Sequence, residues 1–109
     1  MTPAPQLDPP TAAEAIAAGA LPVDVREVGE WEAGHIAGAV LLPLGELGAR
    51  FGELPRDRRL VVVCRTGSRS EYAADALHGA GYQTENLRGG LQEWVAHGLP
   101  LEPADGYVL

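Results

Sequence analysis

Residues 60–71 read LVVVCRTGSRSE, a stretch that predicts a strand, a short loop and a helix in immediate succession. Leu60–Val63 is a continuous apolar run of the kind buried on both faces of a parallel sheet, so the chain should leave the core at Cys64. Ser68 and Glu71 match a capping box at the start of the following helix. Such a loop presents backbone N–H groups and the positive end of a helix dipole, which favour an anion. The anion expected here is the sulfur of Cys64.

Cys64 is therefore a candidate nucleophile. The reactive form of a cysteine is the thiolate, which helix N-termini and nearby arginines stabilise. Arg65 and Arg69 flank the loop, and Arg69 is expected to add positive charge to it, while Gly67 permits the positive φ that lets successive N–H groups converge. A lone cysteine at a strand end is more often a small core residue. A packing role, however, would not call for a turn rich in Arg, Gly and Ser, and the loop would activate the thiol without a general base.

Three ordered segments of the chain resemble the rhodanese-like sulfurtransferases. They are LPVDVREVGEWEAGHIAGAVLLP at 21–43, the loop that begins at Cys64, and LRGGLQEWVAHGLPL at 87–101. Outside the loop, the positions that carry the likeness are Asp24, Arg26, Trp31, Gly34, His35, Ile36, Gly38, Ala39, Gly89, Gly90, Trp94, Gly98 and Pro100. One such motif is weak alone, but three in this order are specific.

The resemblance implies an α/β fold, with a single rhodanese-like domain whose central, mostly parallel sheet is flanked by helices on both faces. Alternating strand and helix signals with short connections agree with this architecture. We expect a domain over 11–100, a flexible N-terminal segment over 1–10 and a C-terminal tail over 101–109. Within the domain, a capping box of Thr11 and Glu14 predicts the first helix start. The last helix is expected from Gly90 to His97, with Leu91, Trp94 and Val95 facing inward.

The implied activity is sulfur transfer. Cys64 would take a sulfane sulfur from a donor such as thiosulfate or a persulfide, hold it as a persulfide, and yield it to cyanide or a thiol. The loop residues expected to bind substrate are Arg65, Thr66, Gly67, Ser68 and Arg69. Asp24 and Arg26 are expected to support them as a buried ion pair. His35 is expected in a turn and not as a base, and Trp31 and Trp94 are expected to pack.

Two alternatives stay open beside a free-standing enzyme. One is a sulfur-relay module that exchanges persulfide with a partner protein. The other is a cysteine phosphatase or arsenate reductase, which the resemblance disfavours because those loops have one more residue between Cys and Arg than the four found between Cys64 and Arg69. In the family, a basic residue two places after the Cys often accompanies good use of thiosulfate, and this chain has Thr66 there.

Composition limits the remaining possibilities. The 109 residues have room for one domain only. A formal net charge of −7 argues against a nucleic-acid partner, and neither a membrane span nor a secretory signal is visible. A single cysteine excludes an internal disulfide and argues against a structural metal site, so no cofactor is expected and the sulfur acceptor must come from outside. A lone thiol favours the reducing cytoplasm.

Overall fold

Strand β4, Leu60–Val63, lies in the middle of a five-stranded parallel sheet in the computed structural model, which describes residues 2–109. The order is β1-β5-β4-β2-β3, with β1 at Gln6–Leu7, β5 at Thr84–Leu87, β2 at Leu21–Asp24 and β3 at Val40–Leu41. Every strand pair is parallel. The expected α/β fold is therefore confirmed, and the loop after Val63 starts from the carboxyl end of the central strand.

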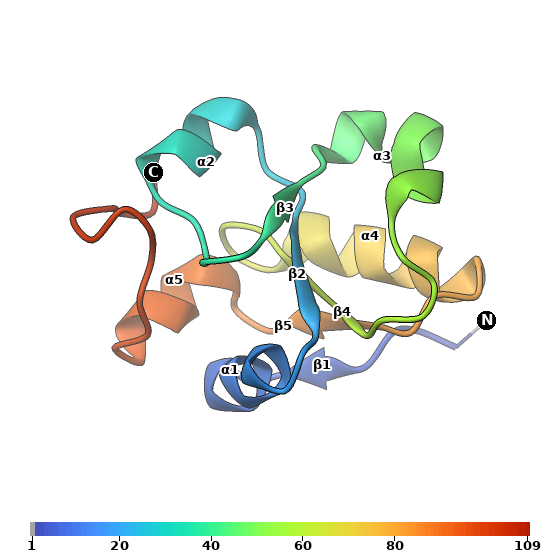
Figure 1. The fold of residues 1–109 in the computed structure, drawn as a ribbon, viewed down its shortest axis with the longest axis horizontal. Coiled ribbons are helices and arrows are strands. Elements are labelled where there is room, and N and C mark those ends of the chain that lie inside the picture. The colour runs from blue at the N-terminus through green and yellow to red at the C-terminus, as the bar shows by residue number, and fades with distance from the viewer. Residues whose placement is uncertain (1) are drawn as a thin grey trace.

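Helices cover both faces of the sheet (Figure 1). On one face, α1 (Pro9–Ala17) and α5 (Gly90–Ala96) pack over Val61 and Val63. On the other, α3 (Leu44–Arg50) and α4 (Ser68–Gly79) pack over Leu60 and Val62. All four β4 side chains are fully buried. The unbroken apolar run at 60–63 is thus explained by two-sided burial.

The remaining elements lie beyond the ends of the strands. Helix α2 spans Val28–Ala33, and the short 3-10 helix η1 spans Phe51–Glu53 directly after α3. The C-terminal segment runs beside α2, shown in red beside cyan in Figure 1. His35 and Glu102 exchange backbone hydrogen bonds there, and the Tyr107 N–H donates to the Ala33 carbonyl. None of the helices within residues 2–109 is long and apolar enough to span a membrane.

Two predicted helix starts are wrong. Helix α1 is capped by Asp8, whose side chain accepts from the Thr11 N–H, so Thr11 lies inside the first turn. Pro9 and Pro10 are the first two residues of α1. Proline suits this turn because an N–H there has no helical partner. Helix α4 is capped by Gly67 in the left-handed conformation, without a side-chain cap, so no Ser68 capping box forms.

The ordered fold begins before the boundary expected at residue 11, because β1 pairs with β5 and α1 starts at Pro9. At the other end, Leu101 and Val108 pack against the core beneath α1 and α5. Helix α5 ends one residue earlier than predicted, at Ala96. Leu91 and Trp94 face inward as expected, but Val95 is 41% exposed, so its predicted burial is wrong.

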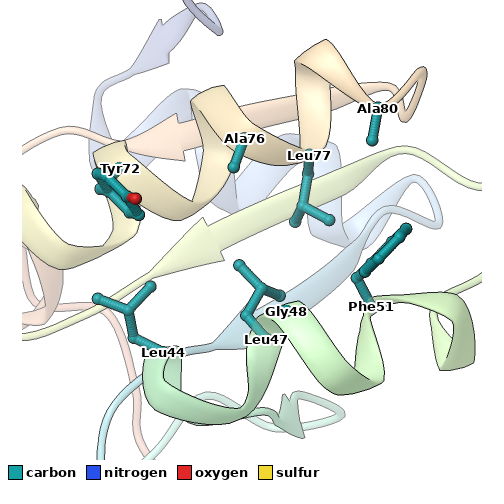
Figure 2. Close-up of a pocket in the computed structure, with 8 residues that line it drawn as sticks. All are labelled: Leu44, Leu47, Gly48, Phe51, Tyr72, Ala76, Leu77 and Ala80. Carbon is teal, nitrogen blue, oxygen red and sulfur yellow. The ribbon is translucent and has the colours of Figure 1, made fainter.

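An apolar groove separates α3 from α4 (Figure 2). Leu44, Leu47 and Phe51 project from the α3 side toward Tyr72 and Leu77 of α4. The groove encloses about 370 Å³, and its other lining residues are small: Gly48, Ala76 and Ala80. Small side chains keep the space between the two helices open. Neither Cys64 nor another residue of the loop lines it, so the groove is separate from the candidate chemistry.

Candidate active site

The sulfur of Cys64 lies inside a ring of hydrogen-bond donors. The Gly67 N–H donates to Sγ at 3.1 Å, and Ser70 donates both its N–H and its hydroxyl at 3.3 Å. Gly67 reaches this orientation with a φ of 101°, in the region that glycine adopts without strain. The side chain of Cys64 is fully buried. Two amides at a helix N-terminus and one hydroxyl therefore favour negative charge on this sulfur.

Helix α5 fixes the backbone of the loop from behind. The N–H groups of Leu91 and Gln92 donate to the carbonyls of Cys64 and Arg65 at 2.8 and 3.0 Å. Gly90 allows this close approach: its φ is 65°, and a Cβ there would lie 2.4 Å from the Arg65 carbonyl oxygen. These two bonds hold the loop backbone in place, and the Gly67 N–H faces the sulfur.

A buried amide supports the loop from the β5 side. Asn86, 1% exposed, donates from Nδ2 to the Gly67 carbonyl at 3.2 Å and to the Gln6 side chain at 2.8 Å. Gln6 in turn donates to the Glu71 carboxylate of α4 at 3.1 Å. This chain of contacts joins β1, β5 and α4 around Gly67. It holds the residue whose N–H approaches the sulfur most closely.

Arg69 is not a free positive charge. Its two terminal nitrogens donate to the two carboxylate oxygens of Glu30 on α2, each at 2.8 Å. The hydrogen bond from Arg69 lowers the pKa of Glu30 to about 2. The same bond raises the pKa of Arg69, and the nearby Cys64 and Asp24 charges raise it further. The pair is thus fully ionised, and it ties α2 to the start of α4.

The other expected substrate-binding residues are dispersed around the loop. Arg65 points toward the C-terminal segment, where its Nε donates to the Leu109 backbone oxygen at 3.1 Å and its guanidinium lies against the Gln92 amide. Thr66 and Ser68 are exposed, whereas Gly67 is buried. Of the five loop residues after Cys64, only Gly67 donates to the sulfur.

Asp24 and Arg26 form the expected buried ion pair. Both side chains are fully buried, and Arg26 donates from Nη2 and Nε to the Asp24 carboxylate at 2.8 and 2.9 Å. A further bond from Nη2 reaches the Gly34 carbonyl at 2.7 Å. The pair fixes the turn after β2 to the end of α2, which carries Glu30. Neither side chain donates to the sulfur.

The amino-acid sequence is similar to that of a known protein family. A model of the rhodanese-like domain matches residues 8–97. This chain belongs to the rhodanese-like domain family. A sulfurtransferase from Allochromatium vinosum is 41% identical over 85 residues, which cover 77% of this chain and 79% of that protein.

Two further similar proteins differ in how much of their own length the match covers. A putative sulfur carrier protein, YrkF, from Bacillus subtilis is 38% identical over 74 residues, 67% of this chain but only 40% of that protein. The crystal structure of a rhodanese-related protein from Thermoplasma volcanium superimposes with a TM-score of 0.83 at 33% identity, covering 89% of this chain and 96% of that one.

Within this rhodanese-like domain, the aromatic and histidine side chains lie apart from the sulfur. Trp31 stacks on His35 with ring centroids 3.7 Å apart, and His35 Nδ1 bonds to the Trp31 carbonyl at 2.9 Å. Trp94 is buried, and its Nε1 donates to the Pro100 carbonyl at 2.9 Å. Within residues 2–109 the donors to Sγ are Gly67 and Ser70 alone. Among the described residues, the sulfur therefore has hydrogen-bond donors that suit an anion, and no histidine base beside it.

Sequence reasoning missed four features of this site: Glu30, Ser70, Asn86 and the particular role of Gly90. Ser70 carries a readable signal, because an N–H in the first turn of a helix has no helical partner and must point outward. Glu30 carries no such signal, because its partner Arg69 lies 39 positions further along the sequence. Asn86 reads as an ordinary strand residue until β5 is placed next to the loop.

Proposed function

We propose that the protein is a sulfurtransferase in which Cys64 carries a sulfane sulfur as a persulfide. The observation that carries this proposal is the ring of two backbone N–H groups and one hydroxyl around Sγ. Such a ring stabilises a thiolate before reaction and the terminal sulfur of a persulfide after it. The names of similar proteins, a sulfurtransferase and a sulfur carrier, support the same reaction class.

In the first half-reaction, the Cys64 thiolate attacks the sulfane sulfur of the donor. A new S–S bond forms at Sγ while the S–S bond of the donor breaks. The electron pair of that broken bond leaves with sulfite when the donor is thiosulfate, or with a thiolate when it is a persulfide. No proton transfer is required, which agrees with the lack of a base among the described residues beside the sulfur.

In the second half-reaction, a nucleophile attacks the outer sulfur of the Cys64 persulfide and the thiolate is regenerated. Cyanide would leave as thiocyanate, and an acceptor thiolate would leave as a persulfide. Because the chain has a single cysteine, the acceptor thiol belongs to another molecule. An unpaired thiol persists in a reducing compartment, so we place the reaction in the cytoplasm.

Steady-state kinetics with a sulfane-sulfur donor and cyanide test this mechanism. Double-reciprocal plots at several cyanide concentrations should give parallel lines, the signature of a covalent intermediate. Replacement of Cys64 by Ser should abolish thiocyanate formation and preserve the circular dichroism spectrum. Intersecting lines, or turnover by the folded C64S variant, would rule out Cys64 as the sulfur carrier.

A sulfur-relay module is the second candidate, favoured by the relative named as a putative sulfur carrier. The two candidates share Cys64 and differ in the donor. A relay module should take sulfur rapidly from a persulfidated protein and slowly from small molecules, whereas a free-standing enzyme should show the reverse. Comparing the rates of persulfide formation with a cysteine desulfurase and with a small donor decides between them.

A further inference from the structure

Two arginines near the loop are paired with carboxylates, and two others, Arg65 and Arg88, are exposed. The carboxylates of Asp24 and Glu30 neutralise the guanidinium groups of Arg26 and Arg69, respectively. Arg65 is exposed and turned toward the Leu109 backbone oxygen, where water screens its charge. Positive potential at the sulfur therefore comes mainly from backbone dipoles. This balance differs from the sequence expectation, in which Arg69 adds net positive charge to the loop.

The contact between Glu30 and Arg69 engages both terminal nitrogens of the guanidinium with one carboxylate. Both terminal nitrogens are engaged at 2.8 Å in the parallel, two-point geometry that an arginine would otherwise offer to the oxygens of a sulfonate. The Glu30 side chain is 17% exposed, so water screens this carboxylate only partly. Arg69 is close enough to Cys64 for the two charges to interact, so a donor at the sulfur has a paired arginine and a fixed negative charge nearby.

Sulfane-sulfur donors differ in the net charge that they bring to the Cys64 sulfur. Thiosulfate carries two negative charges on a sulfonate bonded directly to the transferred sulfur. Methanethiosulfonate transfers its sulfur in the same way, with methanesulfinate as the leaving group, but carries one negative charge because a methyl group replaces one oxygen. Beside the Cys64 thiolate, the dianion meets more repulsion than the monoanion and would gain more from an unpaired arginine.

We infer that Glu30 sets the charge class of the sulfur donor: by occupying the two terminal nitrogens of Arg69, it makes the site select monoanionic sulfane-sulfur donors over dianionic thiosulfate. This inference rests on the proposed sulfur transfer through Cys64. Glu30 is a specificity-determining residue and not a catalytic one, since it acts through Arg69.

The test compares the two donors in the wild type and in Glu30→Gln, with kcat/KM for each measured by thiocyanate formation. The amide keeps the size of the side chain and one acceptor for Arg69 but removes the negative charge. The ratio of kcat/KM for thiosulfate to that for methanethiosulfonate should rise about tenfold, mainly through a lower KM for thiosulfate. The intrinsic reactivities of the donors cancel in this comparison, and a general loss of structure would lower both donors together.

Glu32→Gln is the matched control, because it removes one negative charge from an exposed position on the same helix. Arg69→Gln should move the ratio in the opposite direction, since it leaves the Glu30 carboxylate unpaired beside the donor. This variant also carries the test if Glu30→Gln does not fold. An unchanged ratio in Glu30→Gln, or an equal rise in Glu32→Gln, overturns the inference and leaves the proposed sulfur transfer standing. Failure of the wild type to form a persulfide with either donor overturns both.

Discussion

Among single residues, Ser70 supplies the one donor to the Cys64 sulfur, within residues 2–109, that a side-chain substitution can remove. Its hydroxyl lies 3.3 Å from Sγ and is fully buried. Ser70→Ala leaves the N–H of the same residue in place. We expect persulfide formation to slow about fivefold, the equivalent of about 1 kcal/mol for one hydrogen bond. Stopped-flow or quenched mass measurement of persulfide formation checks this value.

Thr84→Ala is the matched control for Ser70→Ala. Thr84 is also buried and also uses its hydroxyl, which donates to the Ala74 carbonyl at 2.9 Å, but this bond lies away from the sulfur. The control should lower the free energy of unfolding by about 1–2 kcal/mol without slowing persulfide formation. Equal slowing in both variants would show that the Ser70 effect reflects stability and not the cradle.

Gly90 is predicted to be indispensable for the loop. A Cβ at this position would lie 2.4–2.6 Å from the Arg65 carbonyl and the Thr66 nitrogen, and the φ of 65° disfavours any side chain. We expect Gly90→Ala to destabilise the protein by about 3 kcal/mol or more, from strain and overpacking together. Persulfide formation should fall in the fraction that remains folded, since the loop must move.

Gly98→Ala separates backbone strain from the clash. Gly98 has a similar φ of 76°, but a Cβ added there would meet no atom within 4 Å. Its replacement should cost about 1–2 kcal/mol and leave the reaction rate unchanged. Thermal unfolding of the two variants gives the comparison, and similar losses for both would contradict the close packing of Gly90 against the loop.

Among the secondary-structure elements, two helices start at positions that short-range signals misplace, for identifiable reasons. Ser68 matches a capping box, but the sulfur cradle requires Gly67 in the left-handed conformation directly before the helix, and Gly67 becomes the cap. Thr11 also matches a capping box. In the structure, however, the cap is Asp8, three residues earlier, whose side chain accepts from the Thr11 N–H, and prolines occupy the positions between them. Helix existence was predictable from apolar spacing, whereas the caps depended on contacts outside the local motif.

The ion pair between α2 and α4 makes the link between these helices sensitive to acid. The pKa of Glu30 is lowered from 4.5 in the unfolded chain to about 2 in the folded protein. Folding is therefore stabilised by the ionised carboxylate above about pH 4.5, and this contribution is lost as the pH falls toward about 2.

Glu30→Gln removes the acid-sensitive contribution and tests it. The wild type should exceed the variant in free energy of unfolding by about 1 kcal/mol at about pH 7, and more than half of the difference should disappear by about pH 3. Urea denaturation at several pH values measures it. A difference that stays constant across this range would mean that the Glu30 carboxylate is not held by Arg69.

For the molecule as a whole, the fold was predictable in outline and the ends were not. The apolar run at 60–63 and the alternation of elements predict a parallel sheet with covered faces, and the structure confirms it. The segments at 1–10 and 101–109 carry no such periodicity. The placement of residues 2–10 and 101–109 depends on partners far along the chain, such as β5 for Leu7 and the Ala33 carbonyl for Tyr107.

The net charge of −7 predicts a dependence of thiosulfate use on salt. A negatively charged protein repels a dianion, and added salt screens that repulsion. Persulfide formation with thiosulfate should therefore accelerate about threefold between about 10 mM and about 300 mM sodium chloride. Alkylation of Cys64 by uncharged iodoacetamide is the control and should change little. Slower reaction of thiosulfate at high salt would instead indicate net attraction into the site.

The mass of the protein after reaction with a sulfane-sulfur donor reports the covalent intermediate itself. Cys64 in its ring of amides should gain one sulfur atom, about 32 Da, localised by peptide mapping to the segment that contains residue 64. The added mass should disappear on incubation with cyanide, as thiocyanate forms. An unmodified Cys64 after exposure to both thiosulfate and persulfide donors would show that this cysteine does not carry sulfur.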